Sequence, residues 1–199
     1  MGVEFVFRMI ILAVLVLTFI ISGAYRKRAR ESGEFIKHQQ EGWVILLLRM
    51  AFGFSLLGVL LLNIFSPKIL TWAKFELNIY IQAAGVVLAI SCVPLIWWVF
   101  RSIGSNISET ILIKQDHELV TIGPYRWIRH PLYSSALLLL FSISITFRDW
   151  ILLGSFLTGS IAFRLLVIPA EEKQLLEAFG EDYECYQQSR TGALLPWIR

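Results

Sequence analysis

A stretch of polar and aromatic residues interrupts the apolar runs of this chain at "TIGPYRWIRHPLYSS", residues 121–135. The rings of Tyr125 and Tyr133 offer faces that suit a purine or a sulfonium cation. Arg129 and His130 can bind a carboxylate or a phosphate. These residue types, so close together, indicate one wall of a site for a polar ligand.

A second polar group, "IPAEE", follows about forty residues later. Its Glu171 can bind an ammonium group or a ribose hydroxyl. Arg126 and Trp127 in the first stretch have another explanation, because Arg and Trp beside an apolar helix are typical anchors at a membrane surface. We therefore expect ligand contacts from only part of each group.

The composition is that of a membrane protein. Of 199 residues, 56% are hydrophobic and only 17% are charged, whereas a soluble domain carries about 25% charged residues. The net charge of +3 does not indicate nucleic-acid binding, because the basic residues lie in short segments beside apolar runs. Cys92 and Cys185 form no CxxC pair and the histidines are widely spaced, so we expect no metal site. Rossmann, P-loop and serine-hydrolase motifs are missing from the sequence.

Apolar runs predict an all-α, polytopic membrane protein with about five transmembrane segments. Three runs exceed the ~20 residues needed to cross a bilayer. Two shorter runs are joined by Arg148 and Asp149, so we expect a C-terminal helical hairpin. The five predicted segments cover residues 3–25, 43–65, 77–100, 132–147 and 150–168.

The distribution of basic residues predicts the orientation. Most Lys and Arg residues lie in segments 26–42, 101–131 and 169–199. The positive-inside rule then places these segments in the cytoplasm and the N-terminus outside. The segment from Pro169 has apolar residues at helical spacing, so we expect a cytoplasmic amphipathic helix there. The basic loop fits a prokaryotic inner membrane.

This topology predicts a site at the cytoplasmic face. An antiparallel hairpin over residues 132–168 would bring the loop at 101–131 close to the start of the helix at 169–199. Residues 1–100 would then form three N-terminal transmembrane helices with the basic loop 26–42. Residues 101–199 would carry the chemistry.

The two polar groups, with the tail "TGALLP", resemble the integral-membrane methyltransferases, that is, the isoprenylcysteine carboxyl methyltransferases and the related phospholipid methyltransferases. The motif "HELVTIGPYRWIRHPLY" and the later "IPAEEKQLLEAFGEDYECY" carry the resemblance, which covers the chain from about Ile103 onwards. The resemblance implies that S-adenosylmethionine binds in a cytoplasmic pocket. It also implies a lipophilic small-molecule or lipid acceptor that arrives from the bilayer.

The resemblance also implies particular site residues. Glu171 would close the cofactor pocket, and Glu171, Arg164 and Glu172 are the candidates for catalytic roles. The family commonly has an Arg where this chain has Val167, and Arg164 is the candidate to replace it. The tail of the family often has Arg where Ala193 stands here. The residues implied for the cofactor are His117, Glu118, Leu119, Val120, Tyr125, His130, Pro131, Leu132, Tyr133 and Glu171.

The implied reaction is an in-line displacement at the sulfonium methyl group, in which the protein aligns the reactants and excludes water. A carboxylate or thiolate acceptor needs no base, whereas an amine must first lose a proton, to Glu172 or to His130. Two alternatives stay open at this point. One is an NADPH-dependent membrane reductase of the sterol-reductase type, and the other is a non-catalytic membrane relative.

Overall fold

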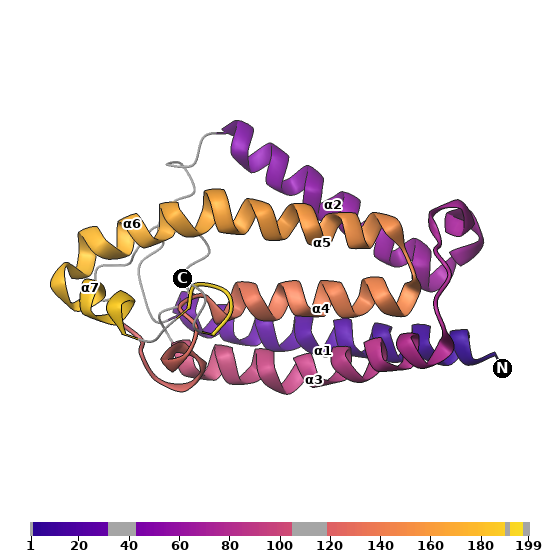
Figure 1. Cartoon of the computed structure of the whole chain (residues 1–199), viewed down its shortest axis with the longest axis horizontal. Coiled ribbons are helices and arrows are strands. Elements are labelled where there is room, and N and C mark those ends of the chain that lie inside the picture. Colours follow the sequence, from indigo (N-terminus) through magenta and orange to yellow (C-terminus); the bar gives the residue numbers. More distant parts are fainter. Residues whose placement is uncertain (1, 32–42, 105–118, 190–191, 197–199) are drawn as a thin grey trace.

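The computed structural model is all-helical over the residues that it describes, which are 2–31, 43–104, 119–189 and 192–196. This confirms the predicted all-α class. Long helices lie roughly parallel and antiparallel to one another, and the loop before α4 and the C-terminal tail meet at one end of this bundle (Figure 1). The elements are α1 (Val3–Glu31), α2 (Trp43–Phe65), η2 (Pro67–Ala73), α3 (Ile79–Ile103), η4 (Gly123–Arg126), α4 (Pro131–Phe147), α5 (Trp150–Ala162), η5 (Phe163–Val167), α6 (Ile168–Phe179) and α7 (Glu181–Gln188).

Three helices are long and apolar enough to cross a membrane. They cover Val3–Ala29, Ile79–Ile103 and Trp150–Phe179. The segment Met50–Phe65 with Pro67–Ala73 would make a fourth span if it is taken as one bent element. The helix Pro131–Phe147 is apolar but shorter. An integral membrane protein follows from these lengths and compositions.

Helix α1 continues beyond the predicted end of its apolar run. The run was expected to end at Tyr25, with a loop from Arg26, but the helix extends through the basic cluster to Glu31. Arg and Lys are good helix formers, so a change from apolar to basic residues does not end a helix. Lys27 and Glu31 lie one turn apart, with 3.9 Å between Nζ and Oε1. The part of the predicted loop that follows, residues 32–42, lies outside the described residues.

The chain turns sharply after α2. The axis of η2 is bent by 114° from that of α2. Pro67 stands at the start of η2, where a proline costs no hydrogen bond because the first turn of a helix has no acceptor for its N–H group. The bend places η2 at the end of the bundle opposite to the loop before α4 (Figure 1).

Helices α3 and α4 pack closely because of a glycine. A Cβ atom on Gly85 would lie 2.7 Å from Oγ1 of Thr146 and 3.0 Å from the carbonyl oxygen of Ser142. Small residues of this kind allow two helices to approach each other within a membrane. The buried hydroxyl of Thr146 donates to the carbonyl oxygen of Ser142 at 2.8 Å, so this polar atom is satisfied within its own helix.

A two-residue corner joins α4 to α5, which lie antiparallel (Figure 1). Arg148 adopts the left-handed conformation with φ of 54° and ends α4. Asp149 then caps α5, because its Oδ1 accepts hydrogen bonds from the backbone N–H groups of Ile151 and Leu152 at 2.9 and 3.1 Å. This cap satisfies two donors that would otherwise lack partners at the start of a helix.

Helix α5 runs into α6 without a break, whereas the sequence predicted a new helix at Pro169. A π-helical turn, η5, joins them, and the N–H group of Ile168 donates to the carbonyl oxygen of Phe163. The wider turn shifts the hydrogen-bond ladder directly before Pro169, so the missing N–H group of proline does not end the helix. The helix therefore extends continuously from Trp150 to Phe179.

Candidate active site

The loop before α4 enters its turn through a glycine. Gly123 has φ of +61°, and a Cβ atom there would lie 2.2 Å from Oγ of Ser102 on α3. Only glycine avoids both the unfavourable conformation and the clash. The next two residues, Pro124 and Tyr125, are buried in η4. The close contact with α3 thus fixes the position of Tyr125.

The C-terminal tail pairs with this loop along the backbone. The N–H groups of Arg129 and His130 donate to the carbonyl oxygens of Gly192 and Ala193 at 2.8 and 3.1 Å. In return, the N–H group of Gly192 donates to Trp127 at 3.0 Å. These bonds hold the backbone of His130 at the start of α4. The residue at Ala193, where the family often has Arg, takes part through its backbone and needs no charge for this contact.

His130 is buried between two carboxylates. Its Nε2 lies 3.2 Å from Oε1 of Glu172, and its Nδ1 lies 3.4 Å from Oε2 of Glu171. Burial alone would lower the pKa of His130, but its contacts with the negatively charged carboxylates of both glutamates outweigh burial and raise the pKa above its ordinary value of 6.5. The imidazole is therefore a cation over a wider pH range than a free histidine.

The two glutamates are adjacent in the sequence but have different surroundings. Glu172 accepts from Nε of Arg129 at 2.7 Å through Oε1, and from Nε2 of Gln187 at 3.2 Å through Oε2. Both of its oxygens are therefore engaged. In the part of the chain that the structure describes, Oε2 of Glu171 is buried and makes no hydrogen bond.

Two further buried polar atoms on the same C-terminal helices lack a hydrogen bond among the described residues. They are Oε1 of Gln174 on α6 and the hydroxyl of Tyr183 on α7. Gln174 follows Glu171 by three residues, so the two lie on the same face of α6. Buried polar atoms normally find partners, and such a group indicates a place where a polar ligand binds.

Aromatic rings border the carboxylates. Tyr133 stacks on His130, with ring centroids 5.8 Å apart, and on Phe163 of η5 at 4.6 Å. Burial raises the pKa of Tyr125, so its phenol stays neutral. The carbonyl oxygen of Tyr125 accepts a hydrogen bond of 2.6 Å from the hydroxyl of Tyr186. The site therefore combines apolar ring faces with a buried acidic edge.

The structure brings together most of the described residues that the sequence analysis singled out. His130, Tyr133, Glu171 and Glu172 are linked by the contacts above, and Pro131 is buried beside His130 at the start of α4. Tyr125 is buried in η4 and contacts Tyr186 of α7. Leu119, Val120 and Leu132 are half-buried, and Arg164 is exposed on η5. His117 and Glu118 lie outside the described residues.

Other side chains of the site were not expected from the sequence. Phe163 is one of many apolar residues in its run, so the sequence gives no sign that it contacts the site. Gln187 belongs to no motif that would indicate a role in the site. Tyr186 lies in the segment from Pro169 that the sequence predicted to be helical. Arg126 and Trp127 are exposed, and Trp127 packs edge-on against Trp98 of α3 at 5.8 Å.

Comparison with known proteins shows a family to which this arrangement is similar. Residues 85–177 match the model of the isoprenylcysteine carboxyl methyltransferase (ICMT) family. Over these residues the chain is similar to the ICMT family. This is a family of membrane methyltransferases, and the matched region includes η4, His130 and both glutamates. Helices α1 and α2 lie outside it.

Individual relatives agree with the ICMT assignment. The chain is 33% identical over 97 residues to the protein-S-isoprenylcysteine O-methyltransferase of Tribolium castaneum, which covers 48% of this chain and 34% of that enzyme. It is 27% identical over 133 residues to protein YpbQ of Bacillus subtilis (strain 168), covering 67% and 73% of the two chains.

The fold also matches a solved ICMT structure. The eukaryotic intramembrane Ras methyltransferase ICMT aligns with a TM-score of 0.53 and 23% identity, over 82% of this chain and 55% of that one. The chain thus spans about half of the solved ICMT protein and about a third of the T. castaneum enzyme. The similarity to the solved structure concerns the arrangement of the helices.

Proposed function

We propose that this protein transfers a methyl group from S-adenosylmethionine to a lipophilic acceptor in the membrane. The observation that carries the proposal is the buried Oε2 of Glu171, which has no hydrogen bond among the described residues and lies 3.4 Å from His130. This oxygen lies in the region that matches the ICMT family. A positively charged, hydrogen-bonding ligand would satisfy it.

The residues present fit S-adenosylmethionine. Glu171 would accept hydrogen bonds from its ammonium group or a ribose hydroxyl, and His130 would hold the Glu171 carboxylate in place through the contact at 3.4 Å. The rings of Tyr125 and Tyr133 suit its adenine or sulfonium. When bound, it supplies a methyl group that is already activated by the sulfonium charge. His117, Glu118, Leu119 and Val120 would complete the pocket through their backbone groups, and Pro131 and Leu132 through packing.

The protein's own contribution is alignment and the exclusion of water. The buried cluster of His130, Arg129 and Glu172 fixes one side of the pocket, and the stacked rings of Tyr133 and Phe163 provide an apolar wall. The exposed Arg164, one turn before Val167, is the candidate to orient a carboxylate acceptor. Glu172 is a poor base for an amine acceptor, because both of its oxygens already accept hydrogen bonds.

We place the site at the cytoplasmic face of a protein with five membrane segments. The proposal follows the excess of basic residues in segments 26–42, 101–131 and 169–199, with the N-terminus outside. Residues 1–100 would anchor the chain, and residues 101–199 would form the site. The acceptor, a lipid or another lipophilic molecule with a carboxylate, amine or thiol, would arrive from the bilayer. A prokaryotic inner membrane is the expected location.

Calorimetric titration of the purified protein with S-adenosylmethionine and with NADPH tests the proposal. We expect S-adenosylmethionine to bind and NADPH not to bind. Binding of NADPH alone would favour a reductase, and binding of neither would favour a non-catalytic relative, for which Val167 in place of the family's Arg is the supporting feature. Incubation of membranes with methyl-labelled S-adenosylmethionine, followed by extraction of labelled lipids, would then identify the acceptor class.

A further inference from the structure

A cavity lies at the end of the bundle opposite to Glu171 and His130. It is formed by the start of α1, the end of α2, the start of α3 and the corner between α4 and α5. Its charged and amide-bearing lining residues are Glu4, Arg8, Asn63, Lys74, Gln82 and Arg148. Its free space of about 50 Å³ exceeds the ~10–15 Å³ that one water molecule needs in the same measure. The cavity therefore has room for a small polar group.

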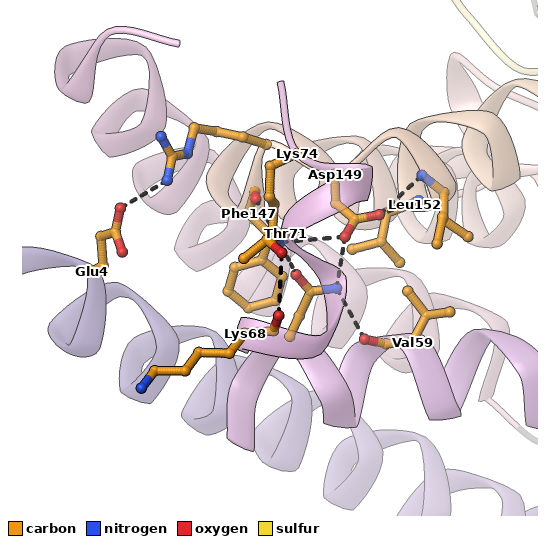
Figure 2. A network of polar contacts seen from close by, with 11 residues as sticks. Glu4, Val59, Lys68, Thr71, Lys74, Phe147, Asp149 and Leu152 are labelled. Carbon is orange, nitrogen blue, oxygen red and sulfur yellow. Dashed lines mark hydrogen bonds and ion pairs between the residues drawn. The ribbon is translucent and has the colours of Figure 1, made fainter. Parts of the chain in front are cut away.

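A buried polar cluster makes one wall of the cavity rigid (Figure 2). Nζ of Lys74 donates to Oδ2 of Asp149 at 3.3 Å, to the carbonyl oxygen of Phe147 at 3.0 Å, and to Oδ1 of Asn63. Nδ2 of Asn63 donates to Asp149 at 3.0 Å and to Val59 at 3.0 Å. Asp149 also caps α5. Contacts within the protein therefore hold this wall in place.

Two arginines on the other side of the cavity have hydrogen-bond donors to spare. Nη2 of Arg148 contacts Oε1 of Glu4 at 2.7 Å, and Nε of Arg8 donates to the carbonyl oxygen of Glu4 at 3.2 Å. Each contact uses one nitrogen, whereas a guanidinium has five N–H donors on three nitrogens. The Glu4 side chain is 63% exposed, so its carboxylate can also accept from a second cation. Cationic and anionic groups therefore face the same cavity.

The surface around the cavity suits a membrane interface. Trp72 of η2 is 76% exposed, and Ile69 in the same element is also exposed. Trp150 at the start of α5 packs on Phe75 with ring centroids 4.6 Å apart. Trp and Tyr side chains concentrate where a membrane protein meets the lipid headgroups. A ligand whose polar head enters the cavity would thus leave an apolar tail against an apolar surface.

We propose that this cavity binds the headgroup of an aminophospholipid, with the phosphate on Arg8 and Arg148 and the primary ammonium on Glu4. Paired arginines form charge-assisted hydrogen bonds to a phosphate, and a carboxylate complements the ammonium group of the same zwitterion. The site lies at the end of the bundle opposite to Glu171. The lipid bound there is a structural ligand, and its binding does not depend on methyl transfer.

The test measures lipid-dependent thermal stability of the full chain in detergent. Phosphatidylethanolamine, phosphatidylglycerol and phosphatidylcholine with identical acyl chains are added separately. We expect phosphatidylethanolamine to raise the Tm most, because its ammonium can donate hydrogen bonds to Glu4, whereas the choline group cannot. Arg8→Gln and Arg148→Gln should each remove most of this shift. Glu4→Gln should remove the preference for phosphatidylethanolamine over phosphatidylglycerol.

Two controls make the result specific. Arg101→Gln changes an exposed arginine at the end of α3, away from the cavity, and should leave the lipid response unchanged. Soluble phosphorylethanolamine should have little effect, because it lacks the acyl chains. The proposal is wrong if the three lipids act equally, if the cavity variants keep the wild-type preference, or if phosphorylethanolamine alone reproduces the shift. None of these outcomes depends on whether S-adenosylmethionine binds.

Discussion

The carboxylate of Glu172 accepts a 2.7 Å hydrogen bond from Nε of Arg129, although the two residues lie 43 positions apart in the chain. Their side chains are only 18% and 8% exposed. This pair joins α6 to the loop before α4. It also distinguishes Glu172 from the adjacent Glu171, which the sequence alone could not do. Oε2 of Glu171, by contrast, makes no hydrogen bond among the described residues.

The first prediction concerns this division between the glutamates. Glu171→Gln should weaken the binding of S-adenosylmethionine by about 10-fold or more, because a charge-assisted hydrogen bond contributes about 1.5–3 kcal/mol. Calorimetric titration measures the change in Kd. Glu177→Gln, at an exposed position on the same helix, is the matched control and should bind normally. Equal affinities for the two variants would place the ligand elsewhere.

The second prediction concerns the Arg129–Glu172 pair. Arg129→Gln or Glu172→Gln should each lower the free energy of unfolding by about 3 kcal/mol, because each removes the oppositely charged group at 2.7 Å from a largely buried charge. The double variant should lose less than the sum of the two, with a coupling of about 1–3 kcal/mol. Unfolding in mixed micelles measures the free energy of unfolding of the wild type, of both single variants and of the double variant, which together give the coupling.

The same helix offers a reference pair. Lys173 and Glu177 are separated by 3.9 Å, and both side chains are largely exposed. An exposed ion pair of this kind contributes little to stability, so its double-variant cycle should show no measurable coupling. Similar coupling in both pairs would mean that Arg129 and Glu172 act only as surface charges.

The third prediction concerns pH. The pKa of His130 is raised in the folded protein above its ordinary value of 6.5, because the contacts with Glu171 and Glu172 outweigh burial. Its contribution to stability is complete below the unfolded-state pKa and is lost as the pH rises through the folded-state pKa. Thermal unfolding between about pH 6 and pH 9 should therefore show a falling Tm. His130→Gln should flatten this profile, and an unchanged slope would contradict the assignment.

The fourth prediction concerns the corner between α4 and α5. Asp149→Ala removes the helix cap, which contributes about 1 kcal/mol, and leaves Lys74 without its carboxylate, which costs about 3 kcal/mol more. Asp149→Asn keeps an oxygen for the cap and should lose less. Asp182→Ala, at an exposed position in the first turn of α7, is the control. Equal losses for Asp149→Ala and Asp182→Ala would show that the buried cluster is not needed.

Much of the architecture could be predicted from residue types along the chain. Apolar runs of membrane length predicted the helical class, and the order of "RHPLY" and "IPAEE" predicted the family, because both signals depend on neighbours in the sequence. Helix ends were predicted less well. The helix passes Pro169 because a π turn at Phe163–Val167 changes the hydrogen-bond ladder, and the local sequence does not reveal such a turn.

Contacts between distant segments decided the rest. Glu171 and Glu172 are chemically identical, and only the approach of Arg129 and Gln187 determines which carboxylate is occupied. The backbone bonds from the tail to His130 likewise use groups that every residue carries, so no side chain marks them. The sequence by itself predicted helices of membrane length and the groups that could bind a cofactor. The tertiary structure decided which of those groups are left for a ligand, because burial and hydrogen bonding depend on residues far apart in the chain.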